Sequence, residues 1–268
     1  MAVFVNGREG GTIDPADRGL QYGDGLFETL AVQDGRARFL DWHLERLAEG
    51  GRRLALPLPE SVILQDEIAR AWPRGRGVVK LVLTRGIGRR GYRPPAVPAV
   101  TRIVSGHPWP DGDDAAWSDG VRLGLCRTRL GRNSALAGIK HLNRLEQVLA
   151  RTEWDDDEMD EGLMLDDRGY AIAGTTSNVF FRLADRWVTP ALTACGVAGV
   201  MRRAFRGWAA EQGVAVTERD VAAAELSGAT AMLLTNALIG AWPVRAFAGR
   251  VLAIDPLATR FNAWLDTQ

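Results

Sequence analysis

The stretch LGRNSALAGIKHLNRLEQVL, residues 130–149, decides how the rest of the chain is interpreted, because it places Lys140 where a glycine-containing loop meets a helical pattern. The apolar spacing that follows predicts a helix over residues 143–154. Such a junction fixes the backbone and directs the side chain into a cleft, where apolar neighbours would lower the pKa of the amine toward neutrality. The alternative, from position alone, is an exposed lysine at the start of a helix.

The composition also singles out Lys140. Lysine and arginine together number 33, and only Lys80 and Lys140 are lysines, so the other 31 are arginines. Arginine has replaced lysine wherever a simple positive charge was sufficient. The surviving lysines are therefore enriched at positions where a guanidinium cannot serve. A Schiff base is such a position, because it needs an amine that loses its proton and attacks a carbonyl.

The remaining composition excludes several classes of protein. The chain has 268 residues, 46% hydrophobic and 25% charged, with a formal net charge of zero, so nothing indicates a field that attracts nucleic acid or a membrane surface. The first residues, MAVFVNGREGG, lack the features of a signal peptide, and no apolar run approaches the roughly 20 residues of a membrane helix. Cys126 and Cys195 lack metal-ligand spacing. We expect a cytoplasmic protein without a metal site.

Alternating strand and helix patterns predict a mixed α/β fold of two domains. The boundaries we expect are 1–107 for a smaller N-terminal domain, 108–120 for a linker rich in Pro, Gly and Asp, and 121–268 for a larger C-terminal domain. A binding site would then lie in the cleft between them. The predicted strands cover 2–5, 26–32, 78–84, 101–105, 121–129, 163–165, 170–173, 178–182, 187–188, 214–217 and 231–235. The other predicted helices begin with an N-cap at Asp41 or cover 60–71, 200–212 and 256–265.

Two segments of the second domain suit a phosphate group. Gly196 and Gly199 precede the predicted helix at 200–212, whose first N–H groups have no partner within the helix. Thr235 and Asn236 follow an apolar strand and could complete the same cup. A routine turn from loop to helix is the alternative for the glycine segment, and the threonine signal alone is weak.

Six segments together carry a resemblance to a known family. They are YGDGLFET (22–29), TRGIGRRGY (84–92), GIKHLNRLEQVLAR (138–151), TSNVFF (176–181), GVAGVMR (196–202) and TNAL (235–238). Their order resembles that of the fold-type IV pyridoxal-phosphate enzymes, which include branched-chain and D-amino-acid aminotransferases and aminodeoxychorismate lyases. The resemblance extends over roughly residues 3 to 265. The stretch around Lys140 is most similar to the lyases of this family.

The resemblance implies pyridoxal 5′-phosphate as the cofactor, held in the cleft between the domains. Lys140 would form a Schiff base with it and then move the proton during catalysis. The side chain of Arg46 and the backbone amides of Val200 and Met201 would bind the cofactor phosphate. The hydroxyl or amide of Thr235 would complete that set.

The resemblance also implies the substrate and the assembly. A lyase of this family converts 4-amino-4-deoxychorismate into 4-aminobenzoate and pyruvate, a step of folate biosynthesis. Thr29, Arg90 and Tyr92 lie in segments that border the substrate in the family, and a homodimer is expected. A transaminase acting on D-amino or branched-chain amino acids is the main alternative. A protein that carries the cofactor without catalysis is a third.

One position departs from the family pattern. Family members generally carry a glutamate five residues before the asparagine that corresponds to Asn178, where it pairs with the pyridine nitrogen of the cofactor. Here that position is Ala173. Without the carboxylate, the ring is a weaker electron sink, which should harm a transaminase more than a lyase whose product becomes aromatic. A replacement carboxylate from elsewhere in the fold, or an enzyme whose activity has decayed, are the alternatives.

Overall fold

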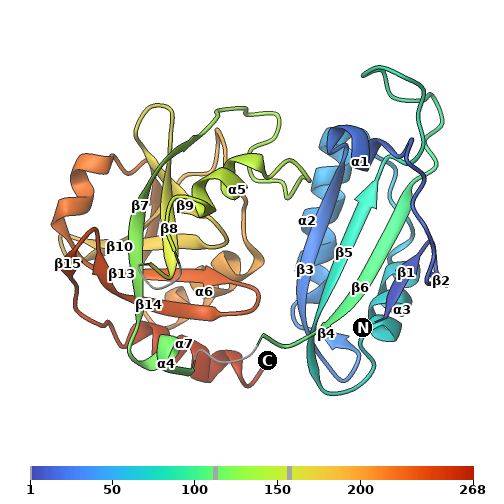
Figure 1. Cartoon of the computed structure of the whole chain (residues 1–268). Coiled ribbons are helices and arrows are strands. Elements are labelled where there is room, and N and C mark those ends of the chain that lie inside the picture. Colours follow the sequence, from blue (N-terminus) through green and yellow to red (C-terminus); the bar gives the residue numbers. More distant parts are fainter. Residues whose placement is uncertain (1, 111–113, 156–158) are drawn as a thin grey trace. The chain divides into compact units, whose positions relative to one another are not determined.

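The computed structural model describes residues 2–110, 114–155 and 159–268 (Figure 1). The chain forms two compact units, one of residues 1–110 together with 139–143, the other of residues 111–138 and 144–268. A short segment around Lys140 therefore belongs to the first unit, although the chain on either side of it belongs to the second. The predicted division at a single linker, residues 108–120, does not account for residues 139–143, which rejoin the first unit.

The first unit is built on a six-stranded sheet with the order β2-β1-β6-β5-β3-β4, and each neighbouring pair is antiparallel. One face of β3 carries Leu26, Glu28 and Leu30, all buried. Helix α2 packs there, because a Cβ on its Gly50 would lie 2.8 Å from the side chain of Leu26. The strands are β1 (Val3–Val5), β2 (Arg8–Glu9), β3 (Gly25–Gln33), β4 (Arg36–Ala37), β5 (Arg76–Thr84) and β6 (Thr101–Pro108), and the helices α1 (Arg18–Tyr22), α2 (Leu40–Leu54) and α3 (Ser61–Ala71).

The second unit is built on a nine-stranded mixed sheet with the order β12-β11-β10-β13-β14-β7-β8-β9, and β15 pairs with β14. Its strands are β7 (Val121–Leu130), β8 (Glu161–Asp166), β9 (Ala171–Gly174), β10 (Asn178–Leu183), β11 (Arg186–Pro190), β12 (Val216–Arg219), β13 (Ala229–Asn236), β14 (Gly240–Phe247) and β15 (Arg250–Val251). Its helices are α4 (Asp114–Ser118), α5 (Leu145–Arg151), α6 (Val200–Glu211), the 3-10 helix η1 (Ala223–Gly228) and α7 (Leu257–Leu265). Phe205 of α6 contacts Phe180 of β10 and Phe261 of α7, with ring centroids 4.6 and 5.2 Å apart. These aromatic contacts fix both helices on the sheet.

The sequence patterns predicted most of these elements, and β3, α3, β7, β10 and α6 are confirmed to within two residues. The predicted N-cap was wrong: α2 begins one residue before Asp41, and its cap is Phe39, with a left-handed φ of 52°. The predicted linker is partly regular, because β6 extends to Pro108 and α4 lies within 108–120; positions 111–113 fall outside the described residues. The helix after Lys140 begins at Leu145 and is shorter than predicted. Among the described residues, no helix combines the length and apolarity needed to cross a membrane.

Candidate active site

Lys140 lies in an extended segment that runs antiparallel beside the start of β3. The amide of Phe27 donates to the carbonyl of Lys140 at 2.9 Å, and the amide of Leu142 donates to the carbonyl of Gly25 at 3.0 Å. His141 forms a β-bridge with Leu26. These bonds hold the backbone at the Lys140 carbonyl and at the two residues that follow, so its side chain starts from a fixed point.

The approach of this segment requires glycine nearby. Gly23 has a φ of 64°, and a Cβ there would lie 2.5 Å from the amide oxygen of Asn143, whose amide nitrogen donates to the Gly23 carbonyl at 3.2 Å. A larger residue would therefore push the lysine segment away from the sheet. This gives a physical role to the first glycine of YGDGLFET.

The amine of Lys140 faces the ring of Phe27, with Nζ 4.2 Å from the ring centroid. Thr29 lies two residues further along β3, so its side chain is on the same face of the strand as Phe27. Lys80, the only other lysine, pairs with Thr29 across the sheet and has its Nζ 5.7 Å from the same ring. The face of β3 opposite the α2 helix thus brings together Lys140 and Thr29, which the sequence singled out separately.

Arg46 lies on the other face of β3, in α2, where it binds a buried carboxylate. Its Nε donates to Oε1 of Glu28 at 2.8 Å, its Nη2 pairs with Oε2, and Nδ1 of His43 lies 2.6 Å from Oε2. Burial alone would raise the pKa of Glu28, but the charge of Arg46 and the hydrogen bonds from His43 and Arg46 lower it to about 2. Glu28 therefore stays charged and fixes the guanidinium. Neither Glu28 nor His43 was predicted from the sequence.

The second unit contains a candidate phosphate site around Thr235. Its side chain is fully buried, and its hydroxyl has no hydrogen-bond partner among the residues that the structure describes. Thr235 pairs with Asn178 across β13 and β10, and the Asn178 amide donates to the carbonyl of Val197 at 2.9 Å. Asn178 thus ties the threonine to the segment that leads into α6.

The first turn of α6 supplies backbone donors to the same region. Gly199 is the N-cap and makes no side-chain cap, and a Cβ at this position would collide with the Asn178 amide oxygen. Val200 and Met201 bury their side chains in the core, so only their backbone amides remain for a ligand. A buried hydroxyl without a partner, next to a helix N-terminus, is the donor set that suits a phosphate.

Ala173 is buried in an apolar cluster. It pairs with Met164 across β9 and β8, and Cys126 and Leu192 belong to the same cluster. The nearby buried carboxylate of Glu161 does not replace the missing family glutamate. It accepts six hydrogen bonds, from the amides of Gly162, Thr175 and Thr176 and the hydroxyls of Thr175, Thr176 and Ser177. Because a carboxylate offers about four lone-pair sites, its oxygens are fully used within the protein.

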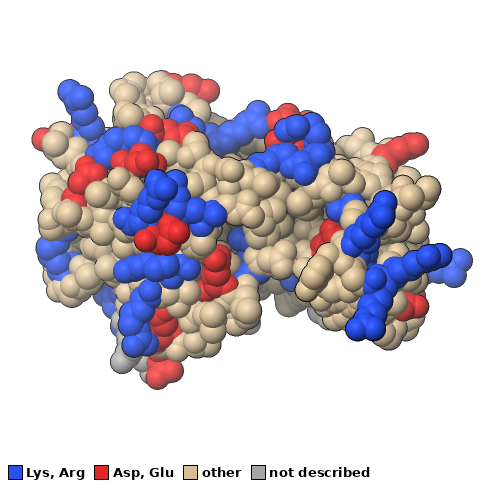
Figure 2. Space-filling model, turned by 90° about the horizontal axis from the view of Figure 1, so that it is seen from above, with Lys and Arg blue, Asp and Glu red and all other residues tan. Residues whose placement is uncertain are grey.

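Arg90 and Tyr92 lie on the loop between β5 and β6. Both side chains are exposed, Tyr92 to 85%. On the surface shown in Figure 2, basic and acidic side chains are interspersed. Among the described residues, no cluster of three or more His, Cys, Asp or Glu side chains could hold a metal ion.

The predicted site residues thus fall into two groups. Lys140, Arg46, Thr29, Arg90 and Tyr92 belong to the first unit, and Val200, Met201 and Thr235 belong to the second. Within the second group, the structure brings together both elements of the predicted phosphate cup.

Comparisons with family models, with known proteins and with solved structures all indicate the same family. Residues 25–247 match the family model described as amino-transferase class IV. The chain is 34% identical to an aminodeoxychorismate lyase of Vibrio harveyi, covering 94% of this chain and 93% of that protein. A crystal structure of a 4-amino-4-deoxychorismate lyase from Pseudomonas aeruginosa is 48% identical, with a TM-score of 0.94, covering 99% of this chain and 98% of that one.

A more distant structure shows the same fold. The PLP-bound form of a hypothetical aminotransferase from Mycobacterium tuberculosis is 24% identical, with a TM-score of 0.82, and covers 100% of this chain and 98% of that one. At this identity the likeness concerns the fold alone. The mixed α/β fold predicted from the sequence is confirmed by these comparisons.

Proposed function

Because the chain belongs to the aminotransferase class IV family, we propose that it is a pyridoxal-phosphate-dependent lyase that converts 4-amino-4-deoxychorismate into 4-aminobenzoate and pyruvate. Two lyases similar to it over nearly their whole length support the reaction type. The observation that carries the cofactor is the buried hydroxyl of Thr235, which has no partner among the described residues and lies beside the N-terminus of α6. A phosphate group would supply the missing acceptor.

The residues that hold the cofactor follow from this fit. The hydroxyl of Thr235 and the amides of Val200 and Met201 would donate to the phosphate oxygens, and Arg46, held by Glu28, would add a charged donor. When bound, pyridoxal phosphate supplies an aldehyde that condenses with an amine and a ring that withdraws electrons from the carbon next to it. Lys140 is the residue that would occupy that aldehyde before the substrate arrives.

The chain then has to move one proton. With the substrate amine in place of Lys140, the free Nζ would take the proton from the ring carbon that bears the nitrogen, while the bond between the neighbouring ring carbon and the enolpyruvyl oxygen breaks. The same Nζ would return a proton to the methylene carbon of the departing enolpyruvyl group, which leaves as pyruvate. The backbone bonds beside β3 give the Lys140 side chain a fixed starting point, and general acid–base help of this kind contributes about 10²–10⁴-fold.

The substrate carries two carboxylates, which require cationic partners. Arginine suits them because its donors match a carboxylate in pairs. We assign Arg90 and Tyr92 to the substrate, together with Thr29, which shares the Phe27 face of β3 with Lys140.

Ala173 favours the lyase over the transaminase. A transaminase relies on the cofactor ring to stabilise a carbanion. Ala173 lies in an apolar cluster, and the nearby carboxylate of Glu161 is already bound by six donors of the protein. The lyase reaction is driven by formation of an aromatic product, so it depends less on electron withdrawal by the cofactor ring.

A mixing experiment separates the alternatives. Purified protein loaded with pyridoxal phosphate is incubated with 4-amino-4-deoxychorismate, with and without a 2-oxo acid as amino acceptor. The lyase forms 4-aminobenzoate and pyruvate in both mixtures. Turnover that depends on the acceptor would favour the transaminase, and no turnover of either substrate would favour a protein that only carries the cofactor.

Borohydride reduction tests the role of Lys140 directly. The reduced, cofactor-loaded protein is digested and mapped, and we expect the label on the peptide that contains Lys140. The chain has only two lysines, so Lys80 is an internal control in the same digest. Label on Lys80, or on neither lysine, would overturn the assignment.

We further propose a cytoplasmic homodimer. Helix α5 exposes Leu145, Val148 and Leu149 to between 52% and 69%, an apolar stripe that a second copy of the chain would cover. The two buried cysteines are not joined in a disulfide, as expected in a reducing compartment. Val148→Asp should shift the sedimentation of the protein from dimer to monomer, while an unchanged sedimentation profile would exclude this stripe from the interface.

A further inference from the structure

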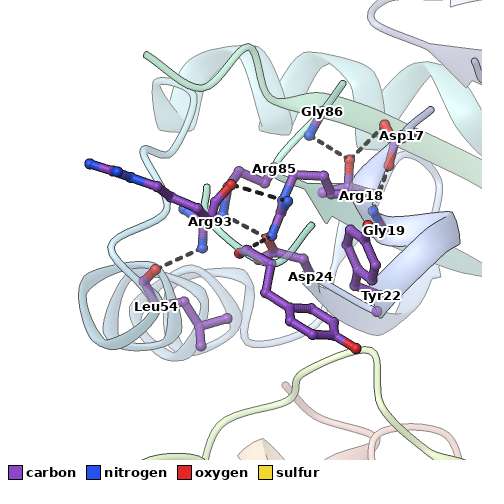
Figure 3. A network of polar contacts seen from close by, with 12 residues as sticks. Asp17, Arg18, Gly19, Tyr22, Asp24, Leu54, Arg85, Gly86 and Arg93 are labelled. Carbon is purple, nitrogen blue, oxygen red and sulfur yellow. Dashed lines mark hydrogen bonds and ion pairs between the residues drawn. The ribbon is translucent and has the colours of Figure 1, made fainter. Parts of the chain in front are cut away.

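A buried arginine holds the backbone of the loop that carries Arg90 and Tyr92 (Figure 3). The side chain of Arg18 is only 4% exposed, although it carries a full charge. Its Nη1 donates to the carbonyl of Gly91 at 3.0 Å and its Nη2 to the carbonyl of Tyr92 at 2.8 Å. A single guanidinium thus binds two successive carbonyls of an otherwise exposed loop.

The charge of Arg18 is balanced by Asp24, which also anchors a second arginine. Oδ2 of Asp24 accepts from Nε of Arg18 and from Nε of Arg85, both at 2.8 Å. Arg85 in turn donates to the carbonyls of Leu54 and Ala55, at the C-terminal end of α2. The network therefore connects the loop to the helix that carries Arg46, through charged hydrogen bonds that are stronger than neutral ones.

The surroundings of Arg18 leave it little freedom. A Cβ at Gly88 would lie 2.6 Å from its Cδ, so the loop packs closely on its aliphatic stem. The ring of Tyr22 lies 4.9 Å from its guanidinium and makes an edge contact with Tyr92, with centroids 5.5 Å apart. The amide of Gly91 donates to the hydroxyl of Tyr22 at 3.2 Å.

The loop therefore combines a fixed backbone with exposed side chains. Arg89, Arg90 and Tyr92 are exposed, while the carbonyls at 91 and 92 are held from inside the unit. A loop needed only to connect two strands would not require a buried charge beneath it, because burying one is costly unless it is fully paired.

We propose that Arg18 is a positioning residue, which fixes the loop so that Arg90 and Tyr92 meet the dicarboxylate substrate in one arrangement. The role at the substrate rests on the proposed function, whereas the hold on the loop does not. Removing Arg18 should therefore have two separate effects, a mobile loop and a weakened interaction with the substrate.

Limited trypsin digestion measures the first effect. Arg89 and Arg90 are exposed cleavage sites, and Arg93 is protected by Pro94. In the holoenzyme, Arg18→Met should raise the rate of cleavage after Arg89 and Arg90 by about tenfold, because charged hydrogen bonds to the loop are lost. Arg102→Met is the matched control, since Arg102 pairs with Glu67 in the same unit without touching the loop. Equal cleavage in the wild type and Arg18→Met would overturn the proposal.

Steady-state kinetics measures the second effect. For 4-amino-4-deoxychorismate we expect Arg18→Met to raise KM about tenfold and to lower kcat less than about threefold. The affinity for pyridoxal phosphate should stay within about twofold, which a general loss of folding would not allow. A loosened loop with unchanged KM would leave Arg18 with a structural role only and would overturn its role at the substrate.

Two further variants keep the test valid. If Arg18→Met does not fold, Tyr22→Phe removes one acceptor of the loop and should give about a threefold increase in cleavage. Arg18→Lys keeps the charge but not the paired donors, so it should restore only part of the wild-type KM; full restoration would contradict the bidentate hold. If the wild type forms no 4-aminobenzoate, the proposed function fails, while the digestion experiment still decides whether Arg18 holds the loop.

Discussion

The regions around Arg46 and around Thr235 differ in whether their buried polar groups have hydrogen-bond partners. Glu28 is 1% exposed and has both oxygens bound by His43 and Arg46. Thr235 is fully buried, and its hydroxyl has no partner among the described residues. A satisfied network fixes the side chains within it, whereas a buried donor without a partner carries a free-energy cost that a ligand can remove. We therefore assign the fixing of the Arg46 guanidinium to the first region, and a buried donor that is free for the phosphate to the second.

Lys140→Arg should give the largest effect, because it removes the proposed proton carrier, which lies on the opposite face of β3 from Arg46, and leaves both regions intact. We expect the rate of 4-aminobenzoate formation to fall by at least about 10⁴-fold, while pyridoxal phosphate still binds without a covalent bond. The measurement is a product assay combined with equilibrium dialysis of the cofactor.

Lys80→Arg is the control, and its rate should stay within about twofold of the wild type. A comparable loss in both variants would mean that lysine chemistry is not confined to Lys140. The assignment of proton transfer to Lys140 alone would then be wrong.

Glu28→Gln should break the satisfied network and make the stability depend less on pH. The folded pKa of Glu28, about 2, lies below its ordinary value of 4.5. The wild type therefore has this contribution in full above about pH 4.5 and loses it as the pH falls toward 2, an amount on the order of 3 kcal/mol. Urea unfolding between pH 7 and pH 2 should show the two proteins converging at the acid end.

Glu67→Gln serves as the comparison within the same unit. Glu67 is equally buried, but its partner Arg102 is 20% exposed, against 12% for Arg46. Its loss should cost less stability at pH 7, because water partly solvates the remaining arginine. An equal loss of stability in Glu28→Gln and Glu67→Gln would show that the Glu28 network stabilises the unit no more than the Glu67–Arg102 pair does.

Ala173→Glu should restore an acidic partner for the cofactor ring. We expect transamination to rise by about tenfold or more and the lyase rate to change less than about threefold, because only the transaminase depends strongly on a protonated ring. Ala173→Gln controls for size in the apolar cluster. A lyase rate that rises by orders of magnitude would contradict the view that aromatisation drives the reaction.

Thr235→Val should give the smallest effect and the most specific one. Removing a hydroxyl without a partner should stabilise the cofactor-free protein by about 1 kcal/mol, yet weaken the binding of pyridoxal phosphate about tenfold. Thr189→Val is the matched control. The Thr189 hydroxyl donates to Val179 and accepts from Arg202, so its loss should destabilise the protein. The assignment fails if both variants change stability in the same direction.

The fold could be predicted largely from local patterns, and the errors have identifiable causes. Strands with a regular alternation or an apolar run, such as β3 and β10, were found because their period is visible in the sequence. Strand β14 was missed: it contains Pro243, which normally argues against a central strand, yet it pairs with both β13 and β7. The start of α2 was misplaced because Asp41 is a good cap by type, while the backbone caps the helix at Phe39.

Two parts of the candidate site carried a signal of their own in the sequence, whereas Arg46, Thr29, Arg90 and Tyr92 were named only because of the family resemblance. Lys140 stood out because lysine is rare in this chain, and the cup around Thr235 because glycines precede a helix. Glu28 gave no such signal, since its partners His43 and Arg46 are 15 and 18 positions away and meet it only after α2 packs on β3. Five of the six donors to Glu161 were equally invisible, because residues 175–177 must fold back on β8 to supply them.

Because residues 139–143 belong to the first unit, that unit can be completed only after the first part of the second unit has been synthesised. The N-terminal 110 residues leave the ribosome long before this segment does, so the edge of β3 at Gly25–Phe27 must wait for its partner. A fragment that ends at residue 110 would lack both that partner and Lys140. Neither unit is therefore encoded by one uninterrupted stretch of the gene. Recombination with a relative would have to exchange the lysine segment together with the first unit, although it is encoded inside the second.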